Sequence, residues 1–386
     1  MMPQFARVAR AGELRTDHVV ALGIAIEEQS VRPHDVLACE AAGMVWHIIQ
    51  KFMPNIKVMH FGLGPIGAAI VKQVAQRPGF TIIGGVDIDP AKIERDLGDV
   101  VGLPRRLGVK VAGDGAKALK RAKPDVVILC TGSSIKGVLP QVETILKSKT
   151  PIVSTTEELS YPGYTHIRQA RQIHQLAKKA KVAVLGTGVN PGFAMDALPI
   201  ALTSVCERVD RIVVNRVQDA RIRRLPFQQK IGAGLTTEQF QKKVDDGSVR
   251  HVGMTESIAM IADSLGWTLD RIADDIQPKL ASVTISSEYL AVDPGYVCGI
   301  IQDGIGYRKG EPVIKLHMEA YLGSPETYDS VDIEGLPSLS MRIAGGIHGD
   351  VATASIIVNS IPKVLSAAPG LHTMRDLPLP SFFSGR

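Results

Sequence analysis

Two patterns of apolar and polar residues divide the chain. Between residues 57 and 190, short apolar runs alternate with stretches of helical periodicity, which predicts parallel strands joined by helices. The predicted strands are residues 57–61, 81–87, 126–131, 152–154 and 182–185, with helices such as 116–121 and 165–179 between them. This alternation is typical of an α/β fold with a doubly wound parallel sheet.

After residue 193 the pattern changes. Helical periodicity at residues 195–206, 237–245 and 255–265 gives way to alternating segments separated by Gly, Pro and Asp turns. These predicted β segments are residues 282–291, 296–307, 313–322, 330–333 and 339–347. They predict a second α+β domain built on a largely antiparallel sheet. A last helix, predicted at residues 350–367, is expected to return to the first domain.

The strand at residues 57–61 runs into the glycine pattern G-x-G-x-x-G, formed by Gly62, Gly64 and Gly67. In a strand-to-helix turn these glycines allow a tight bend, close approach of a pyrophosphate, and close packing of helix on strand. Pro65 suits the first helical turn, and Ile66 follows it in the same loop. We therefore predict that Gly62, Gly64, Pro65, Ile66 and Gly67 bind a dinucleotide in a Rossmann domain.

The context of the glycines supports a nicotinamide cofactor. Asp87 ends the next strand, 20 positions after Gly67 (87 − 67), where an acid binds the ribose hydroxyls of NAD. NAD(H) is therefore favoured, and NADP(H) stays possible. The alternative is a tight glycine turn in a protein that binds no nucleotide.

Three further loops follow predicted strands, at the strand ends where open α/β sheets bind ligands. Thr131 and Gly132 are small residues that would let the cofactor approach the backbone, although a plain turn explains them equally well. Glu157 and Glu158 supply carboxylates, but the surrounding sequence also matches a helix-capping box. Asn190 precedes a proline, so its amide is expected to face nicotinamide or substrate, unless it only forms a turn.

These assignments give three parts. Residues 53–190 with 350–386 are predicted to bind the dinucleotide, and residues 191–349 to bind substrate and form a dimer. Residues 1–52 are an N-terminal extension of unknown role, with an amphipathic helix predicted at residues 35–52. This extension packs on the body of the protein or on a partner subunit, or else it is upstream sequence that precedes a true start at Met53.

Composition narrows the ligand. The chain has 386 residues, 45% apolar content and a formal net charge of only +5, with basic residues scattered except at Arg221, Arg223 and Arg224. This favours anionic small molecules over nucleic acid. The four cysteines form no C-x-x-C pattern, so we expect neither disulfides nor a metal site, and a reducing, cytoplasmic location. No apolar run reaches the roughly 18 residues of a membrane span.

Five stretches together carry a family resemblance. They are residues 62–67 (GLGPIG), 156–162 (TEELSYP), 188–193 (GVNPGF), 223–235 (RRLPFQQKIGAGL) and 349–354 (GDVATA). Over residues 53–386 the chain resembles the 2,4-diaminopentanoate dehydrogenase family and its relatives, the native amine dehydrogenases, within the wider fold group of dihydrodipicolinate reductase. The resemblance implies a homodimer that uses NAD(P) to deaminate an amine oxidatively. In the reverse direction it would form the amine from a ketone and ammonia.

The same resemblance assigns site residues. It implies that Glu157 is the catalytic acid, with Glu158 as the adjacent alternative. The positions that match the family's pocket are Ile135, Glu158, Asn190, Phe193, Arg216, His251 and Thr353. Arg216 would clamp a substrate carboxylate or else form an ordinary salt bridge on a strand. We expect desolvation to raise the pKa of Glu157, and a cationic iminium to lower it again.

Two other functions remain to be weighed. A dihydrodipicolinate reductase should carry H-H-x-x-K and K-x-D-A-P-S-G-T-A-like stretches, and neither is present. A non-catalytic NAD-binding protein would not need the combination of Glu157, Asn190 and the glycine loop. The sequence therefore favours an amine dehydrogenase, without fixing its substrate.

Overall fold

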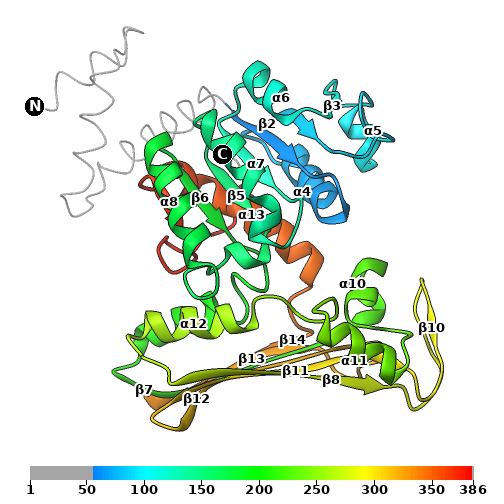
Figure 1. Ribbon diagram of the computed structural model, residues 1–386, viewed down its shortest axis with the longest axis vertical. Coiled ribbons are helices and arrows are strands. Elements are labelled where there is room, and N and C mark those ends of the chain that lie inside the picture. Colours follow the sequence, from blue (N-terminus) through cyan, green and yellow to red (C-terminus); the bar gives the residue numbers. More distant parts are fainter. Residues whose placement is uncertain (1–54, 385–386) are drawn as a thin grey trace, which may run out of the picture. The chain divides into compact units, whose positions relative to one another are not determined.

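The parallel sheet predicted for the first half of the chain is present and has seven strands in the order β15-β6-β5-β4-β1-β2-β3 (Figure 1). A computed structural model describes residues 55–384, so the predicted extension at 1–52 and its helix lie outside the described residues. The strands are β1 (Ile56–Phe61), β2 (Phe80–Val86), β3 (Val111–Ala112), β4 (Val126–Leu129), β5 (Ile152–Ser154), β6 (Ala183–Gly186) and β15 (Gly370–His372). The sequence pattern misses β3 and β15 because two or three residues show no periodicity.

Helices cover both faces of this sheet, which confirms the doubly wound Rossmann fold. On one face lie α4 (Pro65–Gln76) and α13 (Gly349–Ser366), and their side chains share one apolar core with Val58 and Ile128 of the sheet (Figure 1). The opposite face is covered by α6 (Gly115–Ala122), α7 (Ile135–Lys147) and α8 (Ile167–Ala180), and α5 (Leu97–Val101) lies beside β3. The helix predicted at residues 350–367 is α13.

The second sheet has six strands in the order β14-β13-β7-β12-β11-β8. Its strands are β7 (Arg208–Asp219), β8 (Arg271–Leu280), β11 (Val297–Arg308), β12 (Glu311–Tyr321), β13 (Tyr328–Leu336) and β14 (Leu339–Ala344). Only the β7/β12 pair is parallel, so the sheet is largely antiparallel, as predicted.

The predicted strand at residues 282–291 is wrong. The sheet ends instead on β8, and residues 282–291 hold β9 (Ile285–Ser286) and the start of a two-residue partner, β10 (Ala291–Val292). β8 is an edge strand whose residues are all half-buried or exposed. It therefore lacks the apolar alternation by which a strand with one buried face is recognised.

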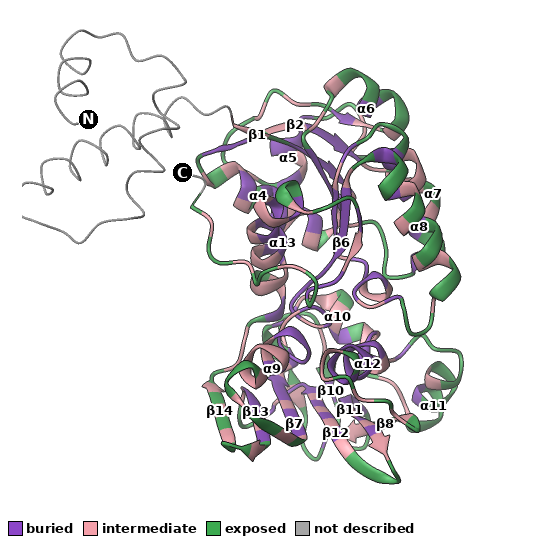
Figure 2. Cartoon of the chain, turned by 90° about the vertical axis from the view of Figure 1, so that its left-hand side faces the viewer, coloured by how far each residue is buried: buried purple, intermediate pink, exposed green. Residues whose placement is uncertain are grey.

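Four helices cover one face of the second sheet, which we call the inner face. They are α9 (Ala197–Leu202), α10 (Leu225–Lys230), α11 (Thr237–Asp245) and α12 (Met254–Ser264). Helix α12 is mostly buried between the two sheets, and the inner-face residues of β12 are buried while its outer-face residues are half-exposed (Figure 2). No element of residues 55–384 covers the outer face in Figure 1.

The two sheets meet where the carboxyl ends of the parallel strands approach the inner face. The division at residues 190/191 and 349/350 stays a prediction, although the two sheets are built from the segments it separates. Within residues 55–384 no helix is both long and apolar enough to cross a bilayer.

Candidate active site

The glycine loop has the geometry that pyrophosphate binding requires. Gly62 has φ +88°, and a Cβ there would lie 2.5 Å from the carbonyl oxygen of Cys130. A Cβ on Gly67 would lie 2.0 Å from the carbonyl oxygen of Gly62. Gly64, by contrast, faces open space, and Pro65 opens α4 without a side-chain cap. The outer glycines therefore serve packing, and Gly64 leaves room for a ligand.

Asp87 directly follows β2 and already has partners. Its Oδ2 accepts a hydrogen bond from the Leu63 amide at 2.8 Å and pairs with the Lys92 ammonium at 3.1 Å, while Oδ1 accepts from the Asp89 amide. Burial raises the pKa of Asp87, but these bonds outweigh it and hold the pKa below its ordinary value. The carboxylate of Asp87 is therefore ionised where it contacts the glycine loop. The neighbouring Lys92 was not predicted from the sequence.

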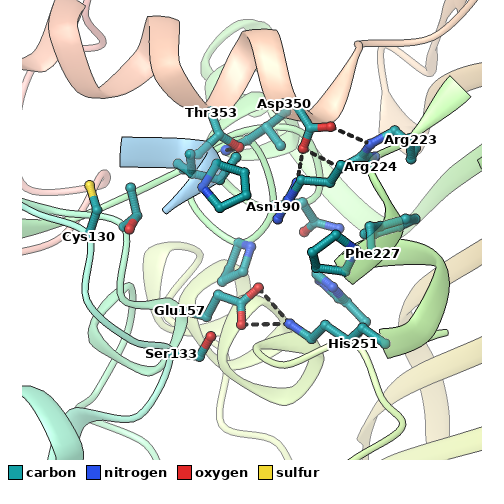
Figure 3. A pocket seen from close by; sticks show the side chains of 18 of the residues that line it. Cys130, Ser133, Glu157, Asn190, Arg223, Arg224, Phe227, His251, Asp350 and Thr353 are labelled. Carbon is teal, nitrogen blue, oxygen red and sulfur yellow. Dashed lines mark hydrogen bonds and ion pairs between the residues drawn. The ribbon is translucent and has the colours of Figure 1, made fainter. Parts of the chain in front are cut away.

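A cavity of ≈ 370 Å³ lies between the parallel sheet and the inner face of the second sheet (Figure 3). Of the residues predicted from sequence, those that line it are Gly64, Pro65, Ile66, Gly67, Thr131, Gly132, Glu157, Asn190, Arg216, His251 and Thr353. The predicted residues that do not line it are Gly62, Asp87, Ile135, Glu158 and Phe193. Cofactor loop and candidate acid therefore share one cavity.

Glu157 begins a single 3₁₀ turn after β5 and points into the cavity, where α10 supplies its partner. The Lys230 ammonium lies 3.0 Å from Oε1 and 2.9 Å from Oε2 of Glu157. Burial raises the pKa of Glu157, but the ion pair with Lys230 outweighs burial and lowers the pKa below the ordinary glutamate value. Our expectation of a raised pKa is therefore wrong for the unliganded site, because the sequence did not reveal Lys230.

Glu158, which the sequence places in the substrate pocket, points away from the cavity. Its Oε2 accepts a hydrogen bond from the Ile135 amide at 2.8 Å, at the start of α7, and lies 3.2 Å from Nε2 of His166. Ile135 itself is fully buried in the core beneath α7 rather than in the cavity. The side chains of adjacent residues on this tight turn point in different directions. That of Glu157 enters the cavity, and that of Glu158 reaches the start of α7.

The loop after β6 presents Asn190 to the cavity and turns Phe193 away from it. Asn190 precedes a cis peptide bond to Pro191, and its Nδ2 lies 3.1 Å from the Met195 sulfur. Buried Asp196 fixes this loop by accepting hydrogen bonds from the amide of Gly192 and the side chain of Ser257. Phe193, which the sequence also places in the substrate pocket, packs against the core under α13 and does not line the cavity.

Arg216 lies on the inner face of β7 and is already paired. Its Nη1 lies 2.5 Å from Oδ1 of Asp329, the residue directly opposite on β13, and its Nη2 donates to the Ile347 carbonyl oxygen. Only 2% of Arg216 is exposed. The alternative of a salt-bridged strand residue therefore describes its unliganded state, although it does line the cavity.

A second fixed group joins the 223–235 stretch to α13. Asp350 pairs with both Arg223, at 3.1 Å, and Arg224 (Figure 3). A Cβ on Gly349 would lie 2.4 to 2.5 Å from the Arg223 guanidinium, so the glycine leaves the space that this side chain fills. Two cations on one carboxylate leave positive charge at the cavity wall.

Arg250 and His251 enter the cavity from the loop before α12. Nε of Arg250 and Nε2 of His251 are buried without a hydrogen-bond partner among the described residues. Burial lowers the pKa of His251 to about 3, so its ring is neutral at physiological pH. Buried polar atoms without partners are rare in folded proteins, and these two are available to a ligand.

Sequence reasoning did not assign five charged residues of this cavity to the site: Arg223, Arg224, Lys230, Arg250 and Asp350. Arg224 and Lys230 lie in a stretch that carries the family resemblance, and Asp350 lies in another, so the signal was present. What the sequence lacks is the pairing of residues more than seventy positions apart. Among residues 55–384, no three His, Cys, Asp or Glu side chains group as ligands for a metal ion.

Comparisons with known proteins agree with this geometry. The family profile described as "2,4-diaminopentanoate dehydrogenase C-terminal domain" matches residues 193–386, and that described as "Dihydrodipicolinate reductase, N-terminus" matches residues 56–186. The 2,4-diaminopentanoate dehydrogenase of Acetoanaerobium sticklandii is 34% identical over 86% of this chain and 96% of its own length. An amine dehydrogenase of Streptomyces virginiae is 24% identical over 84% and 96%.

A solved structure shows the same fold. That of amine dehydrogenase from Mycobacterium smegmatis aligns with a TM-score of 0.77 at 24% identity, over 85% of this chain and 98% of that one. The curated matches that cover most of this chain favour the amine dehydrogenase interpretation over the dihydrodipicolinate reductase alternative, because the reductase profile matches only residues 56–186.

Asp350→Asn should destabilise the protein by about 2–3 kcal/mol at neutral pH, because two guanidinium groups lose their shared carboxylate. Burial raises the pKa of Asp350, but Arg223 and Arg224 lower it below the ordinary value. The stabilisation is therefore complete above a pH of about 4 and is lost as the pH falls through the lowered pKa. Urea unfolding across pH measures this, with exposed Glu311→Gln as control; an equal loss at every pH would contradict it.

Proposed function

The chain belongs to the 2,4-diaminopentanoate dehydrogenase family and is an oxidoreductase that uses a nicotinamide cofactor; we propose that its substrate is an amine that also carries a carboxylate. It would deaminate this amine oxidatively and form it in reverse from the corresponding oxo acid and ammonia. The observation that carries the proposal is a single cavity joining the glycine loop, Glu157 and a group of cations.

The charge of the cavity supports a carboxylated substrate. Five cationic side chains line it, Arg216, Arg223, Arg224, Lys230 and Arg250. Their carboxylate partners are fewer, namely Glu157, Asp350 and Asp329. Arg250 has no ion pair within residues 55–384, so it is our candidate for binding the substrate carboxylate, with a planar donor fork suited to that group.

Glu157 is the proposed acid–base residue. The bound cofactor would accept a hydride from the amine carbon, and Gly64 with α4 would hold its pyrophosphate. During deamination the substrate nitrogen must lose a proton and pass through a cationic iminium, which a water molecule then attacks. The carboxylate of Glu157 can take the proton, stabilise the cation, and activate that water. Asn190, Thr131, Gly132 and Thr353 are proposed to border the nicotinamide.

We further propose a homodimer that forms through the outer face of the second sheet. The half-buried apolar residues Ile301, Ile305 and Val313 on this face and the lack of a covering element among residues 55–384 support it, since an uncovered apolar surface is a candidate interface with a second copy. The free thiols of Cys130, Cys206 and Cys298 suit a cytoplasmic location. Light scattering at micromolar concentration should give twice the chain mass; a monomer would contradict the dimer.

Glu157→Gln should lower turnover by a factor on the order of 10² to 10⁴, the usual worth of an acid–base group, while leaving NADH binding intact. Glu158→Gln is the matched control, because its side chain serves α7 and not the cavity. Steady-state rates with an amino acid panel measure both. A larger loss at Glu158 than at Glu157 would reject the assignment, and a wild-type protein that binds NADH without any turnover would support the non-catalytic alternative.

Arg250→Met should raise KM for carboxylated amines by about 10- to 100-fold, the value of a charge-assisted hydrogen bond, and leave amines without a carboxylate nearly unchanged. The comparison uses pairs of amines that differ only in that group. Exposed Arg271→Met on β8 serves as control. If KM rises equally for both members of a pair, Arg250 does not bind the substrate carboxylate.

We propose that NAD is preferred and NADP accepted, since Asp87 suits the ribose hydroxyls and Lys92 offers a cation 3.1 Å away. Asp87→Ser should weaken NAD far more than NADP, because the carboxylate binds the 2′-hydroxyl and repels a 2′-phosphate. Lys92→Met should weaken NADP more than NAD. Fluorescence titration with both reduced cofactors measures this, and equal losses for the two cofactors would place the adenosine ribose elsewhere.

A further inference from the structure

Lys230 occupies the position beside Glu157 that the proposed function gives to the substrate amine. Its ammonium lies within 3.0 Å of both oxygens of Glu157, from the last residue of α10. A substrate amine is also an ammonium ion when it arrives at neutral pH, with the same charge and the same three N–H donors. The two groups therefore compete for one carboxylate.

We propose that Lys230 is an internal substitute for the substrate ammonium: it neutralises Glu157 in the free enzyme and leaves when a cationic amine enters. The inference rests on the proposed amine dehydrogenase function and adds a residue that sets amine affinity. The exchange makes and breaks only hydrogen bonds. The Lys230 side chain moves away from Glu157 into the open part of the cavity while the arriving ammonium takes its place, so total charge at Glu157 does not change.

The contrast between the ion pairs around the cavity supports this exchange. The other three are made by arginines, which form rigid, often bidentate pairs: Arg216 with buried Asp329, and both Arg223 and Arg224 with Asp350. The Lys230 side chain is 32% exposed, against 3% and 8% for those of Arg216 and Arg223; that of Arg224 is 31% exposed, so the contrast with Arg224 is in side-chain chemistry and not in exposure. A lysine is a strongly hydrated point charge on a flexible stem, so it can leave without breaking a fixed geometry.

The other groups near Glu157 do not take over this role. His251 is neutral at physiological pH, and Arg224 is held by Asp350. Ser133 offers only a hydroxyl. When Lys230 is removed, burial is left to raise the pKa of Glu157 with no adjacent ammonium to oppose it.

Lys230→Met tests the exchange, with methylammonium chloride as a probe that carries the ammonium group alone. At about pH 9 methylamine is still cationic and Glu157 is ionised, so the variant should bind methylammonium on the order of tenfold more tightly than wild type, because the internal competitor is gone. The acid limb of kcat/KM for the amine should also move up by about one pH unit. Lys230→Arg should bind methylammonium more weakly than wild type, because arginine forms a more rigid pair with a carboxylate, and exposed Lys243→Met should change neither measurement.

Calorimetric titration of methylammonium requires no turnover, so it reads the exchange even if no amine in the panel is oxidised and the proposed function fails. Lys230→Gln, which keeps a polar side chain, guards against misfolding of the methionine variant. Unchanged or weaker methylammonium binding in both folded variants, or an acid limb that does not move, would overturn the proposal and leave Lys230 as a structural ion-pair partner.

Discussion

The site depends on one ion pair that spans the two halves of the fold. Glu157 comes from the loop after β5 of the parallel sheet, and Lys230 from α10 beside the second sheet. Neither sheet alone builds the cavity, because the parallel strands supply the cofactor loop and the carboxylate, while the second part supplies the cations. The proposed transfer of a hydride and a proton therefore needs residues from both parts of the fold in one cavity.

The charged groups around the cavity fall into rigid ion pairs and groups that can rearrange. The arginine pairs at Asp329 and Asp350 are tied into strands and α13, where buried ions without partners would be strongly destabilising. Glu157 is paired with a flexible lysine instead, and Arg250 and His251 keep polar atoms without hydrogen-bond partners among residues 55–384. The arginine pairs thus hold the cavity wall in place, and the groups that are paired less rigidly or lack partners are the ones that can bind a ligand.

Sequence reasoning predicted the features that local rules determine. The spacing of Gly62, Gly64 and Gly67 follows from steric contacts inside one turn, and five buried strands follow from their apolar runs. It failed where contacts are long-range: β8 is an edge strand with little alternation, and Glu158 and Phe193 leave the cavity because tight loops turn neighbouring residues apart. The Glu157–Lys230 pair joins residues that are 73 positions apart, and no local pattern announces it.

The proposed enzyme forms a carbon–nitrogen bond between ammonia and an oxo acid whose own carboxylate is bound in the cavity. The most direct measurement follows NADH absorbance with short oxo acids and with matched ketones that lack the carboxylate, each with and without ammonium. The account predicts NADH consumption only when ammonium is present, and much faster with the oxo acids. Consumption without ammonium, or equal rates for the two kinds of ketone, would contradict it.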